Sequence, residues 1–196
     1  MAIDPARFCP INVVDTCAVW NVLSSARLFS AAKEAGCDFC MTGFVFYECL
    51  IKKRGTQKAT DAELMTRLQK AQRTGAFKPH ATTIDDLQRV AQLEQRKGLG
   101  KGELSTIAFA MKIHQAAMTD DQKARQLAKD VGHPLVQTTP HLFSWLIFNQ
   151  RLVDSDKTLV IRQHEEMGQI LSPHFEEAYR LARECALNSR PRQSYT

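Results

Sequence analysis

The chain has 196 residues, of which 44% are hydrophobic and 24% are charged. This ordinary globular composition provides enough apolar material for a buried core and excludes global disorder. The apolar runs are much shorter than the ~20 residues of a membrane span. Residues 1–10 also lack the apolar segment of a secretory signal, so we expect a soluble, cytoplasmic protein with no membrane partner. The formal net charge of +5 permits a polyanionic partner without requiring one.

Basic residues concentrate in two segments. One contains Lys52, Lys53, Arg54 and Lys58, and the other is the arginine-rich end of the chain, from residue 180 onward. Clusters of this kind are either ordinary solvated surface or a surface that contacts nucleic acid phosphates.

The six cysteines do not form a recognisable metal-binding or disulfide pattern. Cys37 and Cys40 have CxxC spacing, but no second pair supplies the remaining ligands of a zinc site. Most of the cysteines adjoin apolar residues, so we interpret them as small buried hydrophobic side chains. The six histidines lack the i, i+3 or i, i+4 spacing of a metal pair on one helix, and we interpret them as core or surface residues.

Short apolar runs alternate with helical patterns along the chain. Strands are predicted at 11–15, 37–42, 116–119 and 135–138, and helices at 18–32, 44–53, 61–73, 84–97, 103–114, 120–131 and 142–148. A polar connection containing Pro79 precedes the fourth helix. This alternation predicts an α/β fold with a mostly parallel central sheet.

Residues 154–196 follow the last of these elements. We interpret 154–157 as a linker and 159–188 as mostly helical, interrupted at Ser172 and Pro173 and followed by an irregular basic tail. The apolar stripe of this segment packs either on the protein's own surface or on a partner chain. We therefore predict a domain at 1–153 and a helical C-terminal extension at 154–196.

Acidic residues stand at the ends of two predicted strands. Asp15 ends the first strand, and Asp120 and Asp121 follow the strand at 116–119. Ligands of parallel α/β sheets bind beyond the carboxyl ends of the strands. Two further acids, Glu48 and Glu103, lie within apolar helical sequence, where an uncompensated carboxylate is costly.

Each acid alone has a structural explanation. Asp15 and Asp120 can cap the helices that follow them, and Glu48 can pair with Lys52 one helical turn later. Together, however, several carboxylates at one edge of a sheet would repel each other unless a divalent cation neutralised them. Carboxylate oxygens suit Mg²⁺ or Mn²⁺, and such a site can activate water for phosphodiester hydrolysis.

Four motifs in this order resemble those of the PIN-domain ribonucleases, a family that includes the toxins of many toxin–antitoxin pairs. The motifs are 13–16 (VVDT), 46–50 (FYECL), 100–105 (GKGELS) and 118–125 (MTDDQKAR). The resemblance spans about residues 12–136 and implies a three-layer α/β/α sandwich. It also implies that residues 1–153 form a nuclease domain.

The resemblance implies a metal-dependent endoribonuclease. Its catalytic and metal-binding acids would be Asp15, Glu48, Glu103 and Asp121, with Asp120 as a further metal ligand, and Thr16 and Thr119 would orient them. Lys52, Lys53, Arg54 and Lys58 would contact RNA. We expect Mg²⁺ or Mn²⁺ as the cofactor, RNA as the substrate and a homodimer, and an antitoxin protein is a candidate partner.

Two other functions remain open from the sequence. A PIN-like module that has lost catalysis would bind RNA or protein, but all the acids are present here. A receiver-like or hydrolase-like α/β domain would use Asp15 with Asp120 and Asp121 for Mg²⁺, but it would leave Glu48 and Glu103 unexplained.

Overall fold

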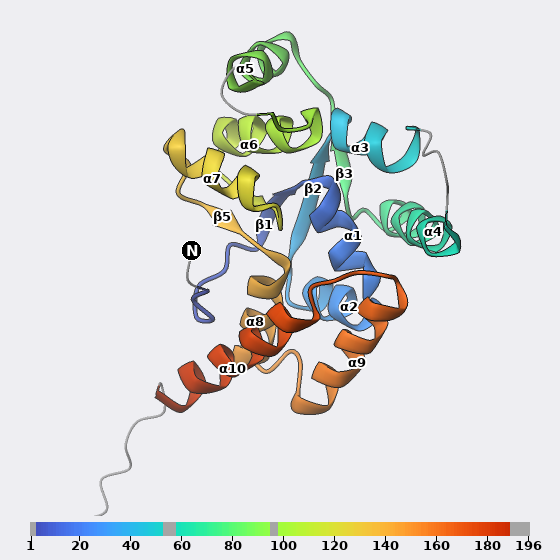
Figure 1. Ribbon diagram of the computed structural model, residues 1–196, viewed down its shortest axis with the longest axis vertical. Helices are drawn as coiled ribbons and strands as arrows, with labels where there is room; N and C mark the ends of the chain where they lie inside the picture. Colours follow the sequence, from blue (N-terminus) through green and yellow to red (C-terminus); the bar gives the residue numbers. More distant parts are fainter. Residues whose placement is uncertain (1–2, 53–57, 95–97, 189–196) are drawn as a thin grey trace, which may run out of the picture.

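The middle layer of the protein is a five-stranded sheet in which every strand pair is parallel. The computed structural model describes residues 3–52, 58–94 and 98–188. The strands lie in the order β3-β2-β1-β4-β5 (Figure 1). Their bounds are β1 (Ile11–Val14), β2 (Asp38–Thr42), β3 (Lys78–His80), β4 (Ala116–Met118) and β5 (Val136–Gln137).

The side of the sheet to which the chain adds successive strands changes at β1. From β1 the chain adds β2 and β3 on one side, and it then returns to add β4 and β5 on the other side. Val14, at the end of β1, pairs with Met118, at the end of β4. The crevice outside the carboxyl ends of two such strands is the usual ligand site of an open α/β sheet.

Helices cover both faces of the sheet, which confirms the predicted α/β sandwich. One layer, seen together on one side in Figure 1, contains α5 (Ile84–Glu94), α6 (Lys101–Ile113) and α7 (Gln122–Asp130). The other layer contains α1 (Thr16–Ser24), α2 (Ala26–Glu34), α4 (Ala59–Arg73), α8 (Thr139–Phe148), α9 (Asp154–Glu166) and α10 (Ser172–Asn188). Successive β1 side chains alternate between the layers, so Val13 packs with Phe109 of α6 while Val14 joins the larger core.

Helix α3 (Gly43–Leu50) begins directly after β2, at the carboxyl end of that strand, and packs against α6. Thr42 caps it by accepting the N–H of Val45 at 3.3 Å. Its buried residues, Val45 and Cys49, belong to the larger core. The exposed side of α3 therefore faces away from the sheet's centre, at the edge where the strands end.

The C-terminal helices α9 and α10 are part of the main core. Val160, Phe175, Ala178 and Ala182 are fully buried in it. The predicted linker at 154–157 is wrong, because α9 already begins at Asp154. A local cap explains this start: the carboxylate of Asp156 accepts the N–H of Val153 at 2.9 Å.

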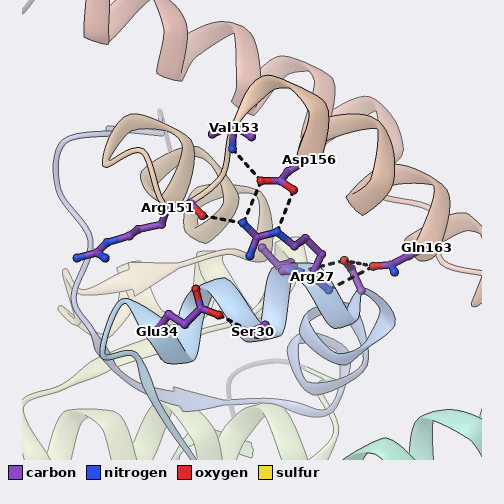
Figure 2. A network of polar contacts seen from close by, with 9 residues as sticks. Arg27, Ser30, Glu34, Arg151, Val153, Asp156 and Gln163 are labelled. Carbon is purple, nitrogen blue, oxygen red and sulfur yellow. Dashed lines mark hydrogen bonds and ion pairs between the residues drawn. The ribbon is translucent and has the colours of Figure 1, made fainter.

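A polar network fixes α9 against α2 (Figure 2). The guanidinium of Arg27 donates two hydrogen bonds to Asp156, at 2.9 and 3.0 Å, and one to the carbonyl of Arg151. The side-chain oxygen of Gln163 accepts a hydrogen bond from Ser25 at 2.8 Å. Asp156 therefore both starts its own helix and binds the neighbouring one.

Two elements differ from the sequence predictions. The single helix predicted at 18–32 is two helices, because Ser25 is extended and its hydroxyl caps α2 by accepting the N–H of Leu28 at 3.1 Å. The Pro79 connection contains β3, an edge strand, where proline is tolerated. Throughout the described ranges, every helix is too short or too polar to cross a membrane.

Candidate active site at the carboxyl edge of the sheet

Asp15 stands between the end of β1 and the start of α1. Its carboxylate caps α1 by accepting the N–H of Ala18 at 2.8 Å, and only 1% of the residue is exposed. It also accepts hydrogen bonds from the thiol of Cys17 at 3.0 Å and from the hydroxyl of Thr119. The capping role considered from the sequence is thus confirmed, but it accounts for only part of this carboxylate's environment.

The ionised form of Asp15 is unfavourable in this setting. Burial, with a smaller contribution from the charge of Asp120, raises the pKa of Asp15 to about 7, although the hydrogen-bond donors around the carboxylate oppose this rise. Burial beside the same carboxylate also raises the pKa of the Cys17 thiol. A cation bound nearby would stabilise the ionised form of this carboxyl group.

Glu48 lies on α3 and points toward the beginning of α6. Its carboxylate accepts a hydrogen bond from the hydroxyl of Thr16 at 2.6 Å and another from the N–H of Gly102 at 3.3 Å. The expected pairing with Lys52 is not among its contacts in the described residues. A side chain at position 102 would overlap the Glu48 carboxylate, so the glycine is what permits this approach.

Glu103 follows Gly102 in the first turn of α6. Its Oε2 is buried and has no hydrogen-bond partner within the residues that the structure describes. A buried carboxylate oxygen without a protein donor is rare in folded proteins, and its partner is then an ion, a ligand or a water molecule. Glu103 is therefore the acid at this edge with the clearest unmet coordination capacity.

Asp120 and Asp121 have different roles. Asp121 caps α7 by accepting the N–H of Ala124 at 2.7 Å, so the prediction that Asp120 caps this helix is wrong. Asp120 instead accepts hydrogen bonds from Asn21 at 2.8 Å and from the backbone and hydroxyl of Thr139 at 2.9 and 2.6 Å. Asn21 and Thr139 were not identified from the sequence, because neither lies near Asp120 in the chain.

Two hydrogen-bonded networks meet at consecutive residues, Asp15 and Thr16. The first runs from Asp15 to Thr119, whose hydroxyl also accepts the N–H of Asp121 at 3.1 Å. The second runs from Thr16 through Glu48 to Gly102, the residue before Glu103. Each of the two threonines thus donates a hydrogen bond to an acid, Thr119 to Asp15 and Thr16 to Glu48.

The acids lie at one edge of the sheet, but their carboxylates do not converge on one position. Among the described residues, no three Asp, Glu, His or Cys side chains are close enough together to hold a metal ion as they stand. Part of the reason is that the carboxylate oxygens of these acids already accept hydrogen bonds. Asp120 accepts them from Asn21 and Thr139, and Asp121 accepts one at the N-terminal cap of α7.

Of the predicted RNA-contacting residues, two can be placed. Lys52 is exposed just after α3 and lines a hollow beside Glu48, and Lys58 is exposed at the start of α4. Lys53 and Arg54 lie outside the described residues. The basic cluster therefore reaches the acidic edge at Lys52.

A family model described as PIN domain matches residues 11–140. The chain belongs to the PIN-domain family. The match confirms the resemblance to this family. PIN domains in general are nucleases, a class of hydrolases, and they typically use divalent metal ions. Neither a curated protein nor a solved structure matches the chain.

The side chains of this PIN domain suit a hard divalent cation. The donors at the edge are carboxylate oxygens, which Mg²⁺ and Mn²⁺ prefer. The orphaned Oε2 of Glu103 and the raised pKa of Asp15 are what a cation would relieve. The candidates to hold one are the five acids at this edge. Asp15 lies beside Asp120 and is linked through Thr119 to Asp121, whereas Glu48 and Glu103 lie at the start of α6.

Proposed function

We propose that this PIN domain is an endoribonuclease that hydrolyses RNA phosphodiester bonds and depends on Mg²⁺ or Mn²⁺. The observation that carries the proposal is the junction of two acid networks at Asp15 and Thr16, beside the point where the strand order reverses. Next to the second network, Glu103 Oε2 is buried without a hydrogen-bond partner among the described residues, and a purely structural role of the networks does not explain this oxygen.

The chain's own residues would hold and orient the reacting groups. Thr119 fixes the rotamer of Asp15, and Thr16 fixes that of Glu48. A divalent ion bound at this edge supplies water activation and charge stabilisation in phosphodiester hydrolysis. Since Asp15 must be ionised to bind a cation, metal binding would release its proton at pH values below its pKa of about 7.

The choice of RNA rather than DNA as the substrate is an inference from the family resemblance, and Lys52 beside Glu48 supports a nucleic acid substrate in general. A toxin role with an antitoxin partner, and a homodimer, stay predictions of the sequence.

A non-catalytic binding module is the second candidate. The burial of Asp15 argues against it, because an unused buried carboxyl group lowers stability without benefit.

The test is cleavage of total cellular RNA by the purified full-length chain with Mg²⁺ or Mn²⁺, beside a sample containing EDTA. Asp15→Asn is the test variant, and Asp38→Asn is its matched control because Asp38 is an exposed acid at the opposite edge of the sheet. We expect metal-dependent cleavage that is lost in the first variant and kept in the second.

The binding-module function predicts a different pattern. It gives no cleavage with either metal and no shift in melting temperature on addition of Mn²⁺. That result would refute the nuclease proposal.

A further inference from the structure

A hollow of about 680 Å³ opens beside Glu48, between α3, α5 and the start of α6. It is lined by Phe44, Tyr47, Glu48, Lys52, Leu87 and Lys101, among others. Its size falls in the range of sites that bind small ligands or single nucleotides, roughly 300–1,000 Å³. Because Glu48 is one of the proposed metal-binding acids, whatever occupies this hollow lies next to the site of chemistry.

Tyr47 presents an unused aromatic ring to this hollow. Half of its surface, 50%, is exposed, and its side chain forms no hydrogen bond or ring contact with any residue that the structure describes. Trp20, in contrast, is only 8% exposed and belongs to the core. Leu87, 47% exposed, adds apolar surface to the wall. An exposed ring with an apolar surround suits a flat, partly apolar ligand.

Two lysines line the same hollow as the Tyr47 ring. Lys52 follows the C-terminal end of α3, and Lys101 is the first residue of α6, and both are exposed and line the hollow. Neither forms an ion pair with an acid in the described residues. Free lysines beside an aromatic face form the combination that binds single strands: stacking for a base and cations for its phosphates.

We propose that an unpaired nucleotide of the substrate stacks on Tyr47 while Lys52 and Lys101 contact its flanking phosphates. This inference rests on the proposed ribonuclease function and adds a specificity to it. A base offers its face to a protein ring only when it has left the helical stack. Tyr47 therefore makes the site selective for single-stranded RNA over a duplex.

The test measures RNA binding apart from cleavage. A fluorescein-labelled single-stranded oligoadenylate is titrated with the full-length protein in EDTA, followed by fluorescence anisotropy, and compared with the same strand annealed to its complement. Tyr47→Phe keeps the ring, and Tyr47→Leu keeps apolar bulk without it. Ile170→Ala is the control for an exposed apolar residue, since Ile170 is 86% exposed and outside the hollow.

We expect tighter binding of the single strand, unchanged in Tyr47→Phe and Ile170→Ala and about tenfold weaker in Tyr47→Leu. In a Lys52→Ala/Lys101→Ala variant, the slope of log affinity against log salt should fall by roughly 0.7 for each lost phosphate contact. Duplex bound as tightly as single strand, or equal binding by Tyr47→Leu and the wild type, would overturn the proposal and favour a protein occupant.

The two proposals fail separately. If the wild type cleaves RNA but Tyr47→Leu binds the single strand as the wild type does, the nuclease stands and the stacking site is wrong. If the wild type cleaves no RNA but its binding in EDTA depends on the Tyr47 ring, the stacking site stands and the nuclease is wrong.

Discussion

Asp15 is a carboxyl group in conflict with its surroundings. It is buried at 1% exposure, and its pKa is raised to about 7 from an ordinary value of 3.8. In the metal-free protein the folded state therefore keeps a proton that the unfolded chain releases in the pH range between these values. The stability contributed by this proton is present at low pH and is lost as the pH rises through about 7.

We expect Asp15→Asn to remove this pH dependence. A pKa shift from 3.8 to about 7 corresponds to about 4 kcal/mol. The free energy of unfolding of the variant, relative to that of the wild type, should therefore rise by several kcal/mol as the pH increases from about 4 to about 8. Asparagine is also a good N-cap, so α1 should keep its start. Urea unfolding in EDTA at both pH values measures the difference. Parallel pH profiles for the two proteins would show that Asp15 is not a desolvated acid.

Gly102 decides where the Glu48 carboxylate can lie. A Cβ at this position would overlap Glu48 Oε2, so Gly102→Ala should push Glu48 away and break its bond to the 102 N–H. We expect cleavage to fall by at least about tenfold, the effect of a misplaced active-site group. Helix stability should not fall, since alanine favours a helix by up to ~1 kcal/mol over glycine.

The control for this change is Gly98→Ala, because a Cβ at Gly98 meets nothing within 4 Å. Initial rates of cleavage and melting temperatures of the two variants separate positioning from folding. Wild-type cleavage by Gly102→Ala would mean that the contact between Glu48 and α6 does not matter for the reaction.

At the scale of elements, α9 and α1 are joined by a buried histidine. His164 is fully buried, and its Nε2 accepts the N–H of Leu171 at 3.1 Å. Nδ1 therefore carries the proton and faces the hydroxyl of Ser24 at 2.6 Å. Burial lowers the pKa of His164 to about 4, against the weaker opposing effect of Glu165. The neutral ring is what holds the turn between α9 and α10 to α1.

Acid should weaken this contact. The unfolded chain protonates His164 near pH 6.5 and the folded protein only near 4, so the stabilisation is complete above about pH 6.5 and is lost as the pH falls toward 4. The loss should be about 3 kcal/mol. Asp15 has the opposite slope over nearly the same range, so the two offset each other in the wild type.

The effect is best measured in the Asp15→Asn background. There, the free energy of unfolding in urea should fall between about pH 7 and pH 4, and His164→Asn should remove most of the fall. A smaller remainder should come from His133, because burial lowers its pKa as well. His174→Gln, at an exposed histidine of α10, should leave the fall intact. A fall of unchanged size in His164→Asn would assign the acid sensitivity to another group.

At the scale of the whole molecule, the sequence predicted what local patterns determine. Asp15 and the pair Asp120–Asp121 stand directly after apolar strands, so the parallel sheet brings them to one edge. Glu48 and Glu103 stood out because they interrupt apolar helices. The PIN-domain match to residues 11–140 supports the same segments that carried the sequence motifs.

What the sequence could not predict depends on contacts between distant residues. Ser24 and His164 are 140 positions apart, and Arg27 and Asp156 are 129 apart, so the contacts that hold α9 against α1 and α2 had no local signal. The same holds for Asn21 and Thr139, which donate hydrogen bonds to the Asp120 carboxylate. The break at Ser25 and the start of α9 do have local caps, at Ser25 and Asp156, which the sequence interpretation missed. Tyr47 was overlooked because its exposure, and not its neighbours in sequence, distinguishes it.

The most direct measurement is the initial rate of cleavage of a labelled single-stranded RNA as a function of Mn²⁺ concentration, for the wild type, Asp15→Asn and Asp38→Asn. If the acids around Asp15 and Thr16 bind the catalytic ion, the rate rises to saturation in the wild type and in Asp38→Asn. It then stays at background in Asp15→Asn at every concentration. Cleavage by Asp15→Asn at the wild-type rate, or no cleavage by the wild type at saturating Mn²⁺, would contradict the assignment of this edge as a metal-dependent nuclease site.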